Sequence, residues 1–75
     1  MSQSLIDEVR ARRPLPPPRV ARAIRQAAGV SQIRLAQELG VHRMTVARWE
    51  NGSRQPREGQ RQAYAALLEA LREAA

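Results

Sequence analysis

The segment HRMTVARWEN, residues 42–51, brings together side chains that suit a groove of a double-stranded nucleic acid. Arg43 and Arg48 each carry a planar guanidinium group, which can donate two parallel hydrogen bonds to O6 and N7 of one guanine. Met44 can press on a thymine methyl group or exclude water, and Ala47 lets a helix approach a groove floor closely. The alternative for each arginine is a phosphate contact or a solvated side chain, and for Ala47 it is helix propensity alone.

Helical geometry separates these four residues from the apolar residues of the same segment. At about 100° per residue, the four fall on one arc of the helix, whereas Val46 and Trp49 fall on the opposite arc. A groove-reading helix needs this division, because one face must join the core while the other stays free to meet base edges.

The charge of the chain also points to an anionic partner. All 13 basic residues among its 75 are arginine, and they face seven acids, which gives a formal charge of +6. This excess suits phosphates and guanine edges, although a solvated surface or a GC-rich genome would also enrich arginine. Trp49 and Tyr64 are the only aromatic residues, too few for a platform that stacks single-stranded bases. Composition therefore favours a nucleic acid as partner and argues against single strands bound by stacking, and the positions of the residues must decide the rest.

Other classes of function lack the residues they need. The chain has no cysteine and one histidine, His42, so we expect no disulfide, no metal site and no thiol nucleophile. Without a nucleophile–base pair or a phosphate-binding loop, we expect no enzyme, no cofactor and no small-molecule ligand. No apolar run approaches the roughly 20 residues that cross a bilayer, and the first residues lack the apolar core of a secretory signal. We expect a cytoplasmic protein without membrane contact.

The first part of the chain predicts a short helix followed by an extended run. Leu5, Ile6 and Val9 form a narrow apolar stripe within a helix over residues 2–13. The segment PLPPP, residues 14–18, blocks a helix and favours a stiff spacer or arm. A docking site of the PxxP type is the alternative for this segment.

From Arg19 onward the pattern becomes helical. Gly29 is a natural stop for the first helix of this part, and Ser31 is a natural N-cap for the next, SQIRLAQEL. Gly40 suits a chain reversal that needs a positive φ. His42 stands where the following helix must be capped, and it is a weaker cap than serine or threonine.

The same spacing predicts where the remaining helices end and which side chains are buried. The helix after His42 stops at Asn51-Gly52, and a last helix begins near Pro56 with Glu58 at its positive end. No segment alternates with period two, so we expect no strand. Besides Val46 and Trp49, the expected core residues are Ala21, Ile24, Ala28, Leu35, Ala36, Leu39, Tyr64, Leu67, Leu68 and Leu71.

The stretch AIRQAAGVSQIRLAQELGVHRMTVARWENGSRQP, residues 23–56, resembles the helix-turn-helix family of phage Cro and cI repressors and their bacterial relatives. The likeness rests on an arginine in the first helix, Gly-x-Ser-Gln, a central Leu-Ala, Gly-Val at the turn, and Trp-Glu-Asn-Gly with a following proline. It implies an all-α fold, a compact bundle of about five helices with an additional short N-terminal helix. The DNA-binding domain would span residues 19–75, with its helix-turn-helix at about 32–51 and residues 1–18 as N-terminal helix and spacer.

The resemblance also implies the residues that meet DNA. Its base-contacting positions fall on Arg43, Met44 and Arg48, with Ala47 close by. Gln32, at a helix N-terminus whose free N–H groups attract anions, is a phosphate contact in the family. The full set of implied phosphate contacts is Gln32, His42, Thr45, Asn51, Ser53 and Arg54, with Arg19, Arg22, Arg34, Arg57 and Arg61 as weaker candidates.

Arg25 and Glu50 have a different role in this resemblance. In the family, an arginine of the first helix pairs with a glutamate at the end of the recognition helix, and both residues stand at matching positions here. We expect a structural ion pair that joins these two helices, and no contact of this pair with DNA.

Two function classes follow from these observations. The first is a sequence-specific transcriptional regulator, a Cro-like repressor of the phage type that binds a palindromic operator through the major groove with helix 42–51. The second is a protein-interaction module, such as an antitoxin that also regulates its own promoter, because the N-terminal helix exceeds what the minimal family domain requires.

A recognition helix of this length reads only a few base pairs, so we expect a homodimer at least on DNA. One surface for it is the C-terminal helix, through Ala65, Leu68 and Leu71. The other is the N-terminal helix with its stripe of Leu5, Ile6 and Val9. The alternative is that both sets complete a monomeric core.

Overall fold

The computed structural model describes residues 3–11 and 14–75, and these form five α-helices without a strand. The all-α expectation is confirmed. Expected helix residues 2, 12 and 13 lie outside the described residues, as does the side chain of Val9. The helices are α1 (Gln3–Ala11), α2 (Pro18–Ala27), α3 (Gln32–Leu39), α4 (Arg43–Asn51) and α5 (Glu58–Ala74). None of them is both long and apolar enough to cross a bilayer.

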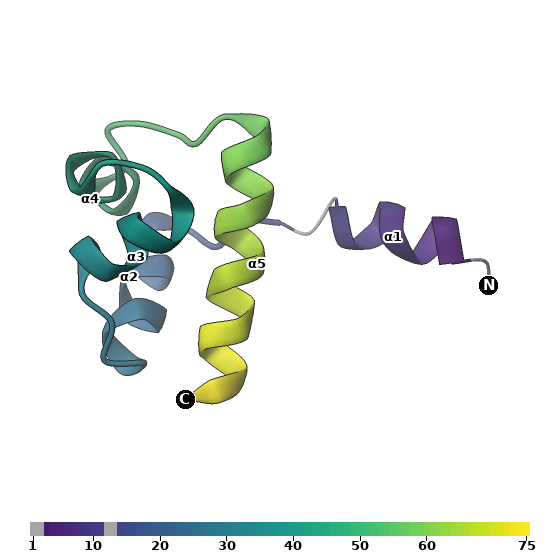
Figure 1. Ribbon diagram of the computed structural model, residues 1–75, viewed down its shortest axis with the longest axis horizontal. Coiled ribbons are helices and arrows are strands. Elements are labelled where there is room, and N and C mark those ends of the chain that lie inside the picture. Colours follow the sequence, from purple (N-terminus) through teal and green to yellow (C-terminus); the bar gives the residue numbers. More distant parts are fainter. Residues whose placement is uncertain (1–2, 12–13) are drawn as a thin grey trace.

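Four of the helices form one body, and α1 stands to one side of it (Figure 1). The long helix α5 runs along α2 and α3, and α4 packs against both α2 and α3. The short connection between α3 and α4 holds these two helices against each other, so that α4 lies at one edge of the body.

Local side-chain and backbone caps fix the bounds of the two central helices. The Ser31 hydroxyl accepts a hydrogen bond from the Arg34 N–H (3.0 Å) and opens α3. Gly40 ends α3 with φ 68°, a left-handed conformation that glycine adopts without strain. His42 caps α4, because its Nδ1 accepts a hydrogen bond from the Met44 N–H at 3.2 Å. The residue type departs from the usual cap, yet it supplies the same bond.

Most of the predicted apolar positions of α2 to α5 form the core, but Ala28 lies outside the cluster, and Leu15, Val30 and Val41 pack against it without having been predicted. Tyr64, Leu35, Leu68 and Val46 are the largest fully buried side chains. Trp49 stacks on Tyr64 with ring centroids 4.9 Å apart and a tilt of 37°, an aromatic contact that joins α4 to α5. The packing of α4 against α5 therefore depends on this one small aromatic cluster.

The prediction of a dimer surface on the C-terminal helix was wrong for Ala65 and Leu68. Ala65 and Leu68 of α5 are only 5% and 1% exposed, and Leu71 packs against the core cluster. A domain of this size has few large apolar residues, so its own core takes up Ala65 and Leu68, while Leu71 packs against the cluster and stays partly exposed.

The proline-rich segment is packed rather than detached. Pro17 is extended (φ −54°, ψ 153°), and α2 begins at Pro18, one residue earlier than expected. Leu15 packs against the core cluster, and a Cβ on Gly52 would lie 3.7 Å from Pro18 Cγ. Residues 15–18 therefore line the body and do not form the free spacer or arm that was expected.

Replacing two glycines should have opposite effects on stability. Gly40→Ala should lower the free energy of unfolding by about 1–2 kcal/mol, because an L side chain is strained at positive φ. Gly59→Ala in α5 should raise it by about 0.5 kcal/mol, because the unfolded chain loses freedom there without strain. A Cβ at either position would meet no atom within 4 Å, so clashes do not contribute. Urea denaturation of both variants measures the two changes, and equal shifts would contradict the assigned backbone conformations.

Tyr64 should titrate far above a free tyrosine. Burial, with the negative charge of Glu50 second, raises the pKa of Tyr64 from 10.0 to about 12. The folded state favours the neutral phenol. The contribution of Tyr64 to the free energy of unfolding is therefore complete below pH 10, and it falls by about 2–3 kcal/mol as pH rises toward 12. Tyr64 is the only tyrosine, so the tyrosinate absorbance of the folded chain reports it alone. A midpoint equal to that of the chain in urea would contradict its burial.

Candidate nucleic-acid interface

The two faces of α4 have different surroundings. Arg43 and Arg48 are exposed, and Met44 keeps 44% of its surface exposed. On the other side Val46 is fully buried and Trp49 is 4% exposed. The helix therefore combines a core face with a free face, as its angular pattern predicted. Ala47 and Thr45 lie between the two extremes, partly exposed.

A buried ion pair holds α4 against α2. Arg25 Nε donates to Glu50 Oε2 at 2.5 Å, and Arg25 Nη2 donates to Glu50 Oε1 at 2.9 Å. The residues named as an ion pair from the sequence thus meet in a two-pronged contact, with 8% and 6% of their surfaces exposed. Arg25 Nη1 also donates to the Val30 carbonyl at 2.8 Å, which fixes the loop between α2 and α3. The hydrogen bonds to Glu50 raise the pKa of Arg25 above its usual value, against the opposing effect of burial.

Gln32 extends this pair to the free face of α4. Its Nε2 donates to Glu50 Oε1 at 3.0 Å, and its Oε1 accepts a hydrogen bond from Arg43 Nη1 at 3.3 Å. A continuous path of hydrogen bonds therefore runs from Arg25 through Glu50 and Gln32 to Arg43. We call these four residues the Arg25–Arg43 relay.

The other predicted phosphate contacts lie at the two ends of α4. His42 is exposed at its N-terminus and uses Nδ1 for the cap, which directs Nε2 away from that bond. Beyond its C-terminus, the Ser53 N–H donates to Asn51 Oδ1 at 2.9 Å, which orders the exposed turn that leads to Arg54. These residues flank the free face of α4, with Thr45 within the helix.

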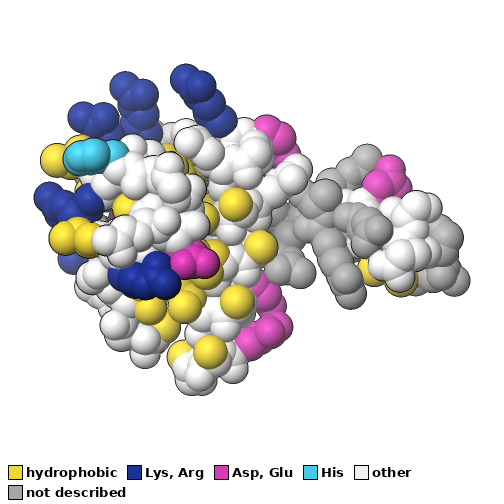
Figure 2. All heavy atoms as spheres, in the orientation of Figure 1, with side chains coloured by type: hydrophobic (Ala, Val, Ile, Leu, Met, Phe, Trp, Pro, Cys, Tyr) yellow, Lys and Arg dark blue, Asp and Glu magenta, His cyan; other side chains and the backbone are white. Residues whose placement is uncertain are grey.

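Cations surround this face. Residues 42–57 contain four arginines and one acid, Glu50, whose charge is buried against Arg25. Figure 2 shows arginine side chains and the single histidine projecting from the end of the body that carries α4. Because the acid is neutralised inside, the outward field at this end is positive and suits a polyanion.

The geometry and the pattern of residues agree with a known family. Residues 22–70, more than half of the chain, match the model of the helix-turn-helix family of Cro/C1 type. The chain belongs to this family. No curated protein and no solved structure gave a match.

Membership in the helix-turn-helix family assigns a general activity to the chain. It is a DNA-binding transcriptional regulator and not an enzyme. In this family α3 and α4 are the helices that give it its name, and α4 is the second of them. Within the described residues, no group of three His, Cys, Asp or Glu side chains is placed to hold a metal ion.

Two features of this helix-turn-helix were missed or undervalued from the sequence. Gln32 was expected only as a phosphate contact, because its partners are 18 and 11 residues away and no spacing rule connects them. Arg22, a weaker candidate, lines a hollow together with Gln32, Ala47 and Asn51 beside α4. The sequence did contain a signal for this position. Arg22 lies three residues before Arg25, so the two share the face of α2 that meets α4.

Removing the buried acid should destabilise the helix-turn-helix strongly. Glu50→Ala leaves Arg25 charged and unpaired inside the body, and should lower the free energy of unfolding by about 3–5 kcal/mol. Glu38→Ala is the matched control, because it breaks an exposed pair with Arg34 whose side chains are 60% and 54% exposed. That loss should stay below about 0.5 kcal/mol. Thermal and urea denaturation measure the loss of stability in both variants. Similar melting curves for the two would show that the Arg25–Glu50 pair does not stabilise the domain.

Proposed function

We propose that this helix-turn-helix protein is a sequence-specific, Cro-like repressor that reads the major groove of double-stranded DNA with α4. It represses by occupying an operator and excluding the polymerase. The observation that supports this most directly is the division of α4, where Arg43, Met44 and Arg48 are exposed while Val46 and Trp49 are buried. A helix with such a free face fits the major groove, where each base pair presents a distinct pattern of donors and acceptors.

Arg43 and Arg48 are the proposed guanine readers. The Arg43 guanidinium rests on Gln32 through Nη1, which limits its rotamers before DNA arrives and leaves its other N–H groups to donate to O6 and N7. Arg48 lies five residues further along α4, about 7.5 Å along the helix axis, on the same exposed arc. Met44 covers a thymine methyl group or excludes water between the two arginines, and the small Ala47 allows close approach of the helix.

The proposed phosphate contacts position this helix without reading sequence. Both polar atoms of the Gln32 side chain already have partners, so its phosphate contact is best made by the backbone N–H at the start of α3 and the remaining Nε2 hydrogen. Asn51 uses its carbonyl oxygen inside the turn, which leaves its amide group as the donor. The full proposed set is Gln32, His42, Thr45, Asn51, Ser53 and Arg54, with Arg22 beside Gln32 and Asn51.

A homodimer on a palindromic operator completes the proposal. The nine residues of α4 span only about 13 Å, which covers a few base pairs. Two copies related by a two-fold axis would read half-sites about 34 Å apart, one turn of the duplex. The symmetry of the operator would then mirror that of the dimer.

The protein-interaction alternative is supported by one observation, the position of α1 to one side of the body (Figure 1). An antitoxin would use such a helix to cover its toxin. Stoichiometric copurification of an unrelated protein would favour this alternative, whereas purification as a single species would favour the repressor.

Sequence selection tests the assigned readers. Selection from a random library of double-stranded DNA should return a palindrome with guanine in each half-site. Arg43→Ala should relax the preference at about one base pair per half-site, with a loss of about 1–3 kcal/mol in discrimination there. Arg54→Ala should weaken binding to all sequences alike and leave the selected motif unchanged.

Salt dependence and a control variant sharpen this test. The logarithm of the affinity should fall by about 0.9 per phosphate neutralised for each tenfold rise in salt, and Arg54→Ala should reduce that slope by about 1. Arg72→Ala removes an exposed arginine in the last turn of α5 that belongs to no proposed contact set, and should change neither motif nor slope. An unchanged motif with Arg43→Ala would show that the reading face is assigned wrongly.

A further inference from the structure

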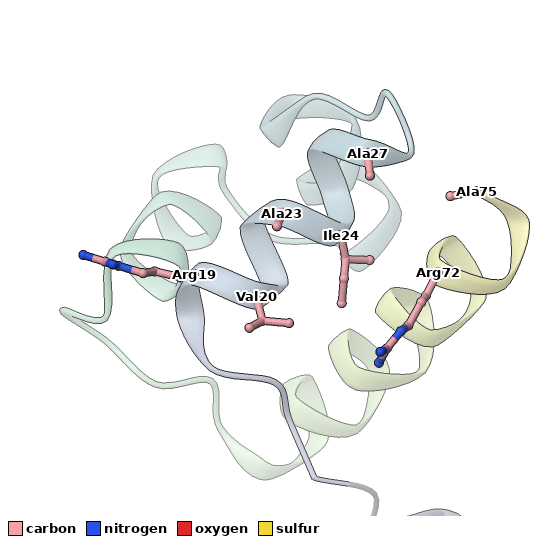
Figure 3. Close-up of a pocket in the computed structure, with 7 residues that line it drawn as sticks. All are labelled: Arg19, Val20, Ala23, Ile24, Ala27, Arg72 and Ala75. Carbon is pink, nitrogen blue, oxygen red and sulfur yellow. The ribbon is translucent and has the colours of Figure 1, made fainter.

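The residues that lead into α2 form a strap along the body. We call residues 15–18, Leu-Pro-Pro-Pro, the proline strap. At one end of the strap, Leu15 packs against the core cluster. At the other end, the Pro17 carbonyl accepts a hydrogen bond from the Ala21 N–H at 2.9 Å, where the chain enters α2 just before Arg19 (Figure 3). The strap is therefore fixed at both ends, and its proline rings limit the backbone freedom between them.

The proline strap lies before the segment that matches the helix-turn-helix family, which begins at residue 22. Family membership therefore assigns it no role, and a role has to follow from its contacts. Two neighbouring hollows lie beside the C-terminal end of α4, one lined by Gly52 and the other by Asn51. Among the described residues, Pro17 and Pro18 alone line both hollows. These two prolines thus stand between the start of α2 and the end of α4.

Pro18 lies beside the turn that ends α4. Gly52 ends this helix with φ 79°, a left-handed conformation in which an L side chain would be strained. Pro18 Cγ lies 3.7 Å from the point where a Cβ of residue 52 would stand, which is an ordinary van der Waals distance. The proline ring therefore packs next to the backbone of this turn.

Backbone hydrogen bonds hold the other side of the same turn on α4. The N–H groups of Ser53 and Arg54 both donate to the Arg48 carbonyl, at 3.1 and 3.3 Å. Residues 51–55 are exposed, and residues 54–57 belong to no helix or strand. The turn thus lies between the end of α4 and the proline strap. It carries three of the proposed phosphate contacts, namely Asn51, Ser53 and Arg54.

We propose that the proline strap positions the turn at residues 51–54 for contact with the DNA backbone, an inference that rests on the phosphate contacts of the proposed function. Phosphate contacts fix the register of a protein on a duplex, and an exposed turn loses conformational freedom when it makes them. Pro18 beside Gly52 limits that freedom before DNA arrives, so that binding costs less. Pro18 is a positioning residue, because it acts through the turn and Arg54.

Binding to a duplex of mixed sequence tests this role, because phosphate contacts do not depend on base sequence. Pro18→Ala removes the ring and leaves a residue that suits the start of a helix. The affinity should fall at least about threefold, and the slope of log affinity against log salt should decrease by up to about 1. Pro14→Ala is the matched control, because Pro14 is exposed in the same run and lines neither hollow. Equal affinities of the two variants would overturn the proposal.

A double-mutant cycle separates positioning from direct contact of the strap with DNA. If Pro18 acts through Arg54, Pro18→Ala should cost clearly less affinity in an Arg54→Ala background than in the natural chain. In an Arg43→Ala background it should cost as much as in the natural chain, because Arg43 stands at the opposite end of α4. Additive losses in both cycles would overturn the proposal.

Amide hydrogen exchange of the free protein tests the same contact without DNA. Pro18→Ala should speed exchange of the Ser53 and Arg54 N–H groups by about tenfold relative to the Val46 N–H inside α4. Equal acceleration of all three would mean a global loss of stability and would overturn the proposal. Neither test needs an operator, so failure of sequence selection by α4 would leave both results unchanged. Failure of the strap would likewise leave the proposed base readers untouched.

Discussion

The arrangement of this domain depends on the buried contact between Arg25 and Glu50. Neither charge is stable inside the body without the other, so the two-pronged contact fixes α4 on α2 in position and in orientation. The third bond of Arg25, to the Val30 carbonyl, adds the loop that leads into α3. One side chain thus contacts the two segments that α2 must hold in place, α4 and the loop into α3, and adds directional bonds to a small hydrophobic core.

The small core also decides which surfaces remain for partners. Tyr64 and Leu68 of α5 are buried against Trp49 and Leu35, so the middle of α5 serves the monomer. Apolar surface stays open in a hollow between α2 and the C-terminal end of α5 (Figure 3), and at the exposed side chains of Ile33 and Met44 on the helix-turn-helix.

The sequence predicted the features that depend on local rules. The faces of α4, the Ser31 and His42 caps and the stop at Gly40 follow from helical periodicity and backbone preference, and the structure contains all of them. The sequence did not predict that Leu15 packs on the core or that Gln32 connects Glu50 to Arg43. Such contacts join residues far apart in the chain, and no periodicity encodes them. The expected dimer surface on α5 failed for a related reason, since spacing marks an apolar face without telling what covers it.

The Arg25–Arg43 relay connects the buried ion pair to the proposed reading face of α4. Glu50 Oε1 accepts hydrogen bonds from both Arg25 and Gln32, and Gln32 in turn accepts one from Arg43. Arg43, the first of the two proposed base readers, is therefore positioned by a glutamine that is itself positioned by a buried charge. An exposed arginine pays side-chain entropy when it is fixed on a base, and a preset rotamer reduces that cost. The Arg25–Glu50 pair that holds α2 against α4 thus also positions the proposed reading face. Because Gln32 lies between the pair and Arg43, a substitution at Gln32 would alter sequence preference more than it alters the fold.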